Sequence, residues 1–465
     1  MNTNSHAFAE FDRDLIASLP TNGPRYTSYP SADRFHHDFT EQSYHAALAE
    51  FKQHSPNAPA SLYVHIPFCN TICYYCGCNK VITKDTSKAD VYLTYLEKEL
   101  RLLAPHLQGK RPLAQLHFGG GTPTFLSDAQ LKKVMNMIQE HFEFLPDGEY
   151  SIEIDPRRVS RETVFLLRQL GFNRMSIGIQ DFDEKVQTAV NRIQSVDETA
   201  SIIHAARDAG FQSISVDLIY GLPHQTLESM KKTLATVLSL DPDRLALYHY
   251  AHLPHIFKPQ RRIDTAAVPS SETKLDILQY AVQTLQTANY VFIGMDHFAK
   301  PNDELAIALE QGLLQRNFQG YSTHAECDLI AIGVSSIGKI GQHYVQNERN
   351  LEAYYQALDE NRLPVMRGYT LTKDDQIRRD IIQDLMCRFA LNFADYANRL
   401  PQDFADYFAA ELQDAAQMQV QGLLTLEADR LIVSNKGRFL IRNIAMLFDY
   451  HLRHRETRAQ YSQTV

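Results

Sequence analysis

Four of the six cysteines lie close together, at Cys69, Cys73, Cys76 and Cys78. Reduced thiols at this spacing usually bind a metal ion or a metal cluster. Zinc commonly takes two pairs of ligands that are spaced apart along the chain, and an iron–sulfur cluster can also take four thiolates. The run CxxxCxxC offers three thiolates at tight spacing, which would leave one iron of a four-iron cluster open to a substrate or cofactor. Structural zinc held by all four cysteines remains the alternative.

A glycine-rich motif, GGGTP, occupies residues 119–123, directly after the apolar run Gln115–Phe118. Glycines let the backbone approach a ligand closely, and exposed N–H groups can bind a carboxylate or a ribose. A glycine run alone often makes a plain turn. This one ends the next apolar run after the cysteine loop, so the two motifs support each other.

The segment from Ser61 to about Ala251 repeats one pattern: a short apolar run, a turn and an amphipathic helical stretch. This alternation predicts a parallel sheet with helices outside it, and six units fit a barrel or a partial barrel. The predicted strands are Ser61–His65, Ala114–Phe118, Tyr150–Ile154, Arg174–Ile179, Ser213–Ile219 and Arg244–Tyr250. The predicted helices are Ala89–Leu103, Asp128–Phe142, Arg161–Leu170, Val196–Ala209 and Leu227–Leu238.

Polar residues appear where several of these predicted strands run out. In βα barrels the chemistry takes place at the C-terminal ends of the strands, although each such residue can instead cap the following helix. Because the set keeps register with the strand pattern, we favour a role in a site. The residues are Glu153, Asp155, Gln180, Asp181, Asp217, His249 and His252.

The flanking segments have a different character. Residues 1–60 form an N-terminal extension, with a helix expected at Phe8–Leu19 and an ordered loop at Gly23–Pro30. The barrel is expected to occupy residues 61–300, including one more strand at Val291–His297.

The C-terminal part of the chain follows the barrel. Residues 301–365 are expected to connect along the barrel edge, with a mixture of helix and glycine-rich turns at 303–345. Residues 366–465 are expected to form a mostly helical domain resembling a winged helix. Its predicted elements are helices at Lys373–Phe389, Ala405–Met418 and Lys436–Phe448, and a hairpin at Leu423–Val433.

Composition narrows the class of protein. The chain has 465 residues, of which 44% are hydrophobic and 22% charged, as in an ordinary globular protein. The net charge of −9 argues against nucleic acid as a partner. No apolar run approaches the roughly 20 residues of a membrane helix, so we expect a cytoplasmic protein without membrane insertion. The isolated Cys327 and Cys387 are expected to be buried packing residues.

The order of these motifs resembles that of a known superfamily, the radical S-adenosylmethionine (SAM) enzymes. In that pattern CxxxCxxC follows the first strand and GGGTP follows the next strand along the chain. More closely, YVHIPFCNTICYYCGCNK at 63–80 and PRYTSYP at 24–30 resemble the oxygen-independent coproporphyrinogen III dehydrogenases of haem synthesis. Further matches are HFGGGTPT at 117–124, EIDPR at 153–157, IQDF at 179–182, VNR at 190–192, DLIYGLP at 217–223, YAHLP at 250–254, IGMDHFA at 293–299, RNFQGY at 316–321 and KGRFLIRNIAM at 436–446.

The resemblance implies a fold and a cluster. The fold is a partial (β/α)6 TIM-like radical SAM barrel, with the N-terminal extension as a substrate lid. Cys69, Cys73 and Cys76 would hold a [4Fe–4S] cluster, whose open iron would chelate the amino and carboxylate groups of SAM. Cys78 would not be a ligand; it matters because related haem chaperones generally carry phenylalanine there.

The resemblance also implies SAM-binding residues. Tyr63, Gly120 and Glu153 match positions that contact this SAM. Family members can bind a second SAM, so two per chain are expected. Tyr75 departs from the family pattern, in which phenylalanine also occurs, but keeps a flat ring. The residues that match positions lining the two SAM sites are Tyr75, Gly121, Thr122, Gln180, Arg192, Asp217, Ala251 and Ile337.

The implied reaction is the conversion of coproporphyrinogen III to protoporphyrinogen IX. One electron splits SAM into methionine and a 5′-deoxyadenosyl radical, which removes a hydrogen from the β-carbon of a propionate. Loss of CO₂ and of one further electron gives a vinyl group, and this happens on two propionates. The expected electron donor is a flavodoxin or ferredoxin, and the protein is expected to be a monomer.

The substrate carries four carboxylates, so cations should line its entrance, and arginine binds carboxylates in a bidentate manner. Arg25, held between Pro24 and Tyr26, is the first candidate for substrate contact. A haem-binding chaperone of the same superfamily remains the alternative function. The other cationic candidates are Lys80, Arg157, Arg261, Arg262 and Arg316.

Overall fold

The computed structural model describes residues 9–19, 22–55, 57–324 and 327–454. It confirms the six predicted strands, each of which pairs in parallel with the next along the chain. Their cores are apolar and inaccessible to solvent, which explains why both faces of the sheet must be covered. The strands are β1 (Ala60–Ile66), β4 (Arg111–Gly120), β5 (Phe142–Ile154), β6 (Arg174–Gln180), β7 (Ser213–Tyr220) and β8 (Arg244–His249).

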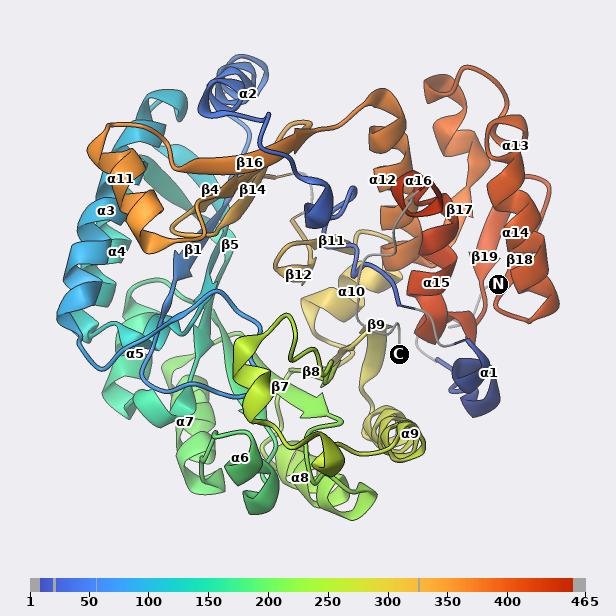
Figure 1. Ribbon diagram of the computed structural model, residues 1–465, viewed down its shortest axis with the longest axis horizontal. Helices are drawn as coiled ribbons and strands as arrows, with labels where there is room; N and C mark the ends of the chain where they lie inside the picture. Colours follow the sequence, from blue (N-terminus) through green and yellow to red (C-terminus); the bar gives the residue numbers. More distant parts are fainter. Residues whose placement is uncertain (1–8, 20–21, 56, 325–326, 455–465) are drawn as a thin grey trace.

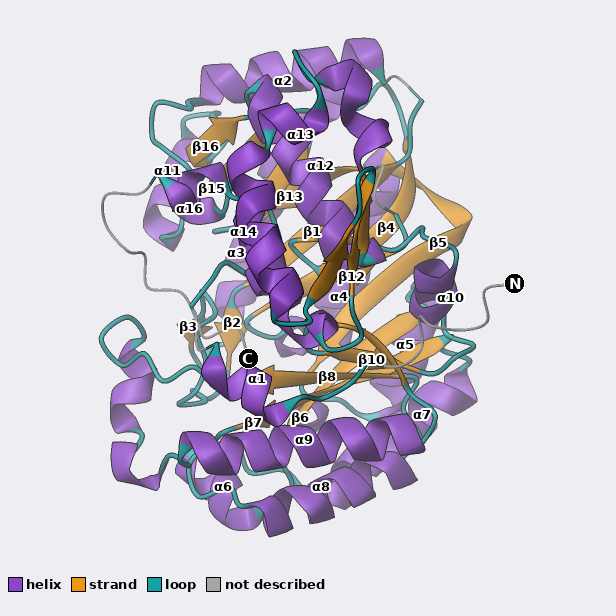
Figure 2. Ribbon diagram, turned by 90° about the vertical axis from the view of Figure 1, so that its right-hand side faces the viewer, coloured by secondary structure: helices purple, strands orange, loops and turns teal. Residues whose placement is uncertain are grey.

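The predicted helices are present and lie outside the sheet (Figure 1). Several begin at a serine or threonine whose side chain accepts a backbone N–H of the first turn, as Ser127 and Ser195 do. Figure 2 shows α8 (Leu227–Ser239) and α9 (Ser271–Thr287) side by side on one face of the sheet. The predicted helices are α3 (Ser87–Leu103), α4 (Asp128–His141), α5 (Arg161–Gln169), α7 (Val196–Ala209) and α8 (Leu227–Ser239). Two more, α6 (Glu184–Ala189) and α9 (Ser271–Thr287), were not predicted.

The sheet extends beyond the six strands on both sides, to twelve strands in all. The single strand expected at Val291–His297 is instead two, β9 (Val291–Gly294) and β10 (His297–Ala299), because the chain reverses at Met295 and Asp296. On the other side, β13 (Asp328–Ile332) pairs in parallel with β1.

Of the described residues in 303–345, expected to mix helix with turns, more lie in strands than in helices. They contain one helix, α10 (Glu304–Glu310), and a small hairpin of β11 (Gln315–Asn317) and β12 (Gly320–Ser322). The sheet is completed by β14 (Ile337–Ile340), β15 (His343–Asn347) and β16 (Val365–Thr370), with α11 (Leu351–Asp359) between the last two. Short strands within glycine-containing turns carry too weak a periodic signal to be recognised from sequence.

The N-terminal segment runs between the barrel and the C-terminal domain (Figure 1). The helix expected at Phe8–Leu19 is α1 (Arg13–Ser18); residue 8 lies outside the described residues. The segment then passes through the ordered loop around Tyr26 to α2 (Glu41–His54). The Tyr26 hydroxyl donates to Asp449 at 3.0 Å, which fixes the loop to the C-terminal domain.

The C-terminal domain departs from the expected pattern in detail. The predicted helix Lys373–Phe389 is α12 (Lys373–Arg388). The helix expected at Ala405–Met418 is divided at Phe408, and the one expected at Lys436–Phe448 is a series of short helical turns. Cys387 is buried, whereas Cys327 is only half-buried, which corrects the expectation for it. The remaining elements are α13 (Phe404–Tyr407), α14 (Ala409–Val420), α15 (Ile441–Ala445), α16 (Tyr450–Arg453) and the three-stranded sheet of β17 (Ala390–Asn392), β19 (Arg430–Val433) and β18 (Leu424–Leu426).

Among the described residues no helix combines the length and the apolar character needed to cross a membrane.

A buried carboxyl group, Glu99 on α3, joins the added strands to the barrel. Its oxygens accept hydrogen bonds from Tyr354 Oη at 2.6 Å, Gly333 N at 2.8 Å and Asn347 Nδ2 at 2.6 Å. Burial nevertheless raises the pKa of Glu99 to about 7. The folded protein therefore binds a proton here that the unfolded chain has released.

We expect the free energy of unfolding to fall as pH rises from about 4.5 to 7, by at most about 3 kcal/mol from this group. The sign follows because the folded state holds more protons than the unfolded state in that window. Urea unfolding of wild type and Glu99→Gln across this range measures the effect. The variant should lose this part of the slope, and equal slopes would contradict the assignment.

Candidate functional site

The cysteine loop joins β1 to α3 and is held by neighbouring backbone. It begins with β2 (Phe68–Cys69) and ends with β3 (Val81–Ile82), which pair in parallel. Its middle is fixed where Tyr74 N donates to Val190 O at 2.9 Å and Asn191 Nδ2 donates to Ile72 O at 2.7 Å. These contacts keep the thiols at the carboxyl edge of the sheet.

The glycine motif holds the other side of the loop. Gly121 N donates to Ile66 O at 2.8 Å, and Thr122 N donates to Phe68 O at 2.9 Å. A Cβ on Gly121 would lie 2.6 Å from Pro67 O, so no larger residue fits at this position. The predicted Gly121 and Thr122 therefore connect the end of β4 to the start of the cysteine loop.

The four loop cysteines are free thiols with different electrostatic surroundings. Burial raises the pKa of Cys69 to about 12, and the neighbouring Cys76 and Cys73 add to the shift. A hydrogen bond with Cys78 lowers the pKa of Cys76 to about 6, and the nearby Lys80 contributes. The effect of Cys76 and Cys73 on Cys69 is consistent with one shared electrostatic environment for the three predicted ligands.

The donor chemistry of the loop fits a cluster, because thiolates are soft ligands that suit iron–sulfur clusters. In the described part of the chain, no three His, Cys, Asp or Glu side chains are grouped to hold one metal ion. The irons of a [4Fe–4S] cluster are separate atoms, each with its own thiolate, so cluster ligands need not converge on one point.

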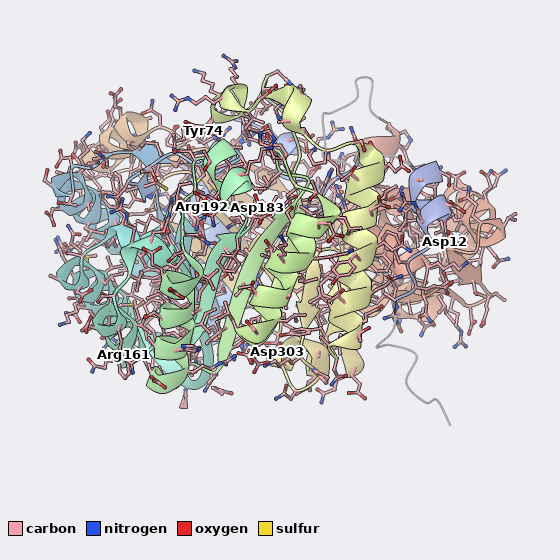
Figure 3. All side chains as sticks on the ribbon, turned by 90° about the horizontal axis from the view of Figure 1, so that it is seen from below. Asp12, Tyr74, Arg161, Asp183, Arg192 and Asp303 are labelled. Atoms are coloured by element: carbon pink, nitrogen blue, oxygen red, sulfur yellow. The ribbon has the colours of Figure 1, made fainter. Side chains whose placement is uncertain are left out.

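Arg192 lies beside the thiols and is buried. Its Nη1 donates to Cys73 Sγ at 3.7 Å, its Nη2 donates to Gly178 O at 2.6 Å, and Asp155 lies 3.7 Å away. Its Nε is buried without a hydrogen-bond partner in the described residues. Figure 3 shows Arg192 near Tyr74 and Asp183, at the end of the strands opposite to Arg161 and Asp303.

A cavity of about 500 Å³ opens at the carboxyl edge of β1, β4 and β5. Four predicted residues line it: Tyr63, Gly120, Glu153 and Ile337. Gly120 N donates to Glu153 Oε2 at 3.3 Å, and the positive φ of 119° at this position favours glycine. The structure thus brings these residues together from strands far apart in sequence.

Three other predicted residues, Asp217, Tyr75 and Ala251, are not among those that line this cavity. Asp217 accepts from Ser176 Oγ at 3.3 Å, and burial followed by the charge of Glu153 raises its pKa to about 7. Gln260 Nε2 donates to both Tyr75 O at 3.0 Å and Ala251 O at 3.2 Å, which connects these two positions.

Three further predicted residues, Gln180, Asp155 and Asp181, differ in their contacts. Gln180 ends β6 with a positive φ of 69°. Asp155 accepts from Arg157 N at 3.2 Å, so it caps a turn as well as lying beside Arg192. Asp181 is engaged by Gln225 and Thr233 and has a structural role.

Sequence reasoning did not single out two histidines of the cavity wall. His65 follows Tyr63 by two residues on β1, so both face the same side, and their Oη and Nδ1 atoms lie 3.1 Å apart in a hydrogen bond. His117 pairs in register with Tyr63 across the sheet, stacks on its ring at 5.8 Å and lies 3.2 Å from Glu153 Oε1. Because side chains two residues apart on a strand share a face, the prediction of Tyr63 as a site residue could also have indicated His65.

Apart from Ile337, the cavity residues from the connecting segment were also missed, because that segment had no predicted strands. Those that line the cavity, together with two from the end of the cysteine loop, are Cys78, Asn79, Phe318, Gln319, Ser335, Ser336, Gln346, Arg349 and Arg367.

The first cationic candidate, Arg25, forms an ion pair with Asp296. Its guanidinium also lies over the Tyr248 ring, 5.6 Å from the ring centre. Arg25 therefore faces the barrel interior, but a carboxylate of the protein already neutralises it.

The parallel sheet and the three-thiol loop define the class of protein. Residues 63–237 match the family model described as Radical SAM superfamily, and residues 371–440 match the HemN C-terminal domain. The site is therefore that of a radical SAM protein, for which a [4Fe–4S] cluster and SAM are the cofactors.

Comparison with individual proteins narrows this class. The chain is 48% identical to the oxygen-independent coproporphyrinogen III oxidases of Salmonella typhimurium and Escherichia coli K12, over 98% of this chain and 99% of each relative. The oxidase of Helicobacter pylori is 44% identical over 96% of this chain and 97% of its own length. A solved structure of coproporphyrinogen III oxidase from Escherichia coli, described as a radical SAM enzyme, has a TM-score of 0.91 and covers 96% of this chain and 100% of its own.

The chain belongs to the family of oxygen-independent coproporphyrinogen III oxidases. These relatives are enzymes, so the chaperone alternative is not favoured.

We expect Cys73→Ser to lose the cluster, because serine replaces one of three soft thiolate donors. Iron and sulfide content of anaerobically purified protein, with its visible absorbance, measures this. Cys78→Ser is the matched control and should retain iron if Cys78, as the resemblance implies, is not a ligand. Equal loss of iron in both variants would contradict the three-ligand assignment.

Proposed function

We propose that this chain catalyses the oxidative decarboxylation of two propionates of coproporphyrinogen III, which gives protoporphyrinogen IX. The observation that carries the proposal is full-length similarity to enzymes of this name, with 48% identity over 98% of the chain. The cysteine loop and the adjoining cavity at the carboxyl edge of the sheet support it.

In this proposal Cys69, Cys73 and Cys76 hold the [4Fe–4S] cluster. When bound, the cluster and SAM supply the 5′-deoxyadenosyl radical that removes hydrogen from the substrate. Arg192 and Lys80 place positive charge beside the thiols, which favours their ionised form. Lys80 Nζ also donates to Cys76 O and Cys78 O, at 3.1 and 3.2 Å, and so restrains the end of the loop.

Tyr63, Gly120, Glu153 and Ile337, which line the 500 Å³ cavity, would bind SAM. The Glu153 carboxylate suits an ammonium or hydroxyl donor, and the flat ring of Tyr63 suits stacking. A second SAM per chain is part of the proposal. The residues assigned to the two SAM sites together also include Tyr75, Gly121, Thr122, Gln180, Arg192, Asp217 and Ala251.

The rest of the proposal concerns access and partners. The N-terminal extension, fixed between the barrel and the C-terminal domain, would act as the substrate lid and exclude water from the site. A flavodoxin or ferredoxin would supply electrons, and the protein would act as a monomer.

An anaerobic incubation with coproporphyrinogen III, SAM and a chemical reductant tests the function. Protoporphyrinogen IX and 5′-deoxyadenosine should both form, and Cys73→Ser should form neither. Haem binding without turnover would instead support the chaperone alternative and contradict the proposal.

We expect Arg25→Ala to weaken porphyrinogen binding about tenfold or more, as loss of a charge-assisted hydrogen bond does, and to leave SAM cleavage largely intact. The measurements are KM for coproporphyrinogen III and the yield of 5′-deoxyadenosine.

Removing Arg25 also leaves the Asp296 carboxylate without its ion-pair partner. The double variant Arg25→Ala/Asp296→Asn removes both charges together and separates this effect from loss of substrate contact. An unchanged KM in both variants would remove Arg25 from the substrate site.

A further inference from the structure

A second cavity, of about 430 Å³, lies between the barrel edge, the N-terminal loop and the C-terminal domain. Residues 26–29 of the N-terminal loop form part of its wall, and α12 and the segment after β17 form the opposite part. Phe318, at the turn of the β11–β12 hairpin, lines both this cavity and the 500 Å³ cavity. The two cavities therefore lie on either side of this hairpin and share one wall residue.

Cationic side chains outnumber carboxylates in the lining of the second cavity. Its described lining contains five cations and three carboxylates. Three of the cations are already paired within it: Arg379 and Arg399 with Asp380 at 3.0 and 2.8 Å, and Arg388 with Asp384 at 3.1 Å. The remaining two, Arg316 and Lys339, form no ion pair in the described part of the chain.

Arg316, on β11, is only 7% exposed. Its Nε donates to Arg25 O at 3.2 Å, and its guanidinium lies 4.8 Å from the centre of the Tyr321 ring. Its Nη1 is buried with no hydrogen-bond partner among the described residues. The nearby Asp296 carboxylate is taken by Arg25, so it does not satisfy this nitrogen.

Lys339, on β14, faces the same cavity from the barrel edge. No hydrogen bond or ion pair of its ammonium group occurs within the described ranges. Burial lowers the pKa of Lys339, and the charge of Arg379 adds to this, while Asp328 and Asp380 act in the opposite direction. Asp380 is held by two arginines, and Asp328 accepts from Gly341 N at 2.7 Å.

A guanidinium nitrogen buried without an acceptor costs free energy that an anionic ligand would recover. We propose that Arg316 and Lys339 form a subsite for two carboxylates of the porphyrinogen that are not reacting, while a reacting propionate faces the 500 Å³ cavity. This subsite rests on the proposed function. The N-terminal loop and the C-terminal domain would then both contribute wall residues to the substrate site.

The test uses the full-length protein in two assays. The first is the KM for coproporphyrinogen III in the anaerobic reaction. The other is fluorescence titration with coproporphyrin III, the stable oxidised porphyrin that carries the same four propionates, and it does not depend on turnover. Arg316→Gln and Lys339→Gln should each weaken binding about tenfold, and the double variant about a hundredfold.

Arg316→Lys keeps the charge and should lose less than Arg316→Gln. Arg399→Gln is the matched contrast, because Arg399 lines the same cavity but is already paired with Asp380; it should bind as wild type does. Iron content, melting temperature and 5′-deoxyadenosine formation without porphyrinogen should remain at wild-type values in all variants.

Unchanged binding in Arg316→Gln and Lys339→Gln would overturn the subsite, and so would an equal loss in Arg399→Gln. If wild type makes no protoporphyrinogen IX, the proposed function fails, and the coproporphyrin titration still decides the subsite. A variant that unfolds is replaced by Arg316→Lys, for which a small loss supports the subsite and none overturns it.

Discussion

The site depends on a cysteine loop that its neighbours hold in place. The loop has almost no regular structure, apart from the two-residue strands at its ends. Its backbone is instead bonded to the end of β4 on one side and to the segment around Val190 on the other. A loop fixed at several points has less conformational entropy to lose when it binds a cluster, so the thiols are preorganised. The same contacts bring Arg192 to Cys73.

Charge balance organises the interior around that loop. The thiols lie beside cations, and Glu153 lies beside His117 and Gly120 N. Burial raises the pKa of Glu99, and burial with the charge of Glu153 raises that of Asp217 despite the nearby Arg192. Farther from the loop, Arg25 is neutralised by Asp296. Arg316 and Lys339, in contrast, form no ion pair with a carboxylate within the described ranges. The interior is thus closer to neutrality near the cofactor residues than in the second cavity.

The sheet explains how residues from distant parts of the chain reach one cavity. An open barrel of six strands leaves an edge at β1, and β13 covers it by pairing in parallel. The strands that follow carry Ile337, Ser336 and Gln346 to the wall opposite Glu153. The N-terminal loop and C-terminal domain then close the remaining side, because Tyr26 and Asp449 bond them together.

The sequence by itself determined the six parallel strands, their helices, the three-thiol motif and the glycine motif, because these follow from local periodicity and from fixed spacing along the chain. It also placed Glu153 and Asp217 where their predicted strands run out. Only the tertiary structure decided that Arg25 faces Asp296, that His117 meets Tyr63, and that residues 328–370 extend the sheet. Such contacts join positions far apart in sequence, and no local pattern specifies which distant side chain fills a given space or neutralises a given charge.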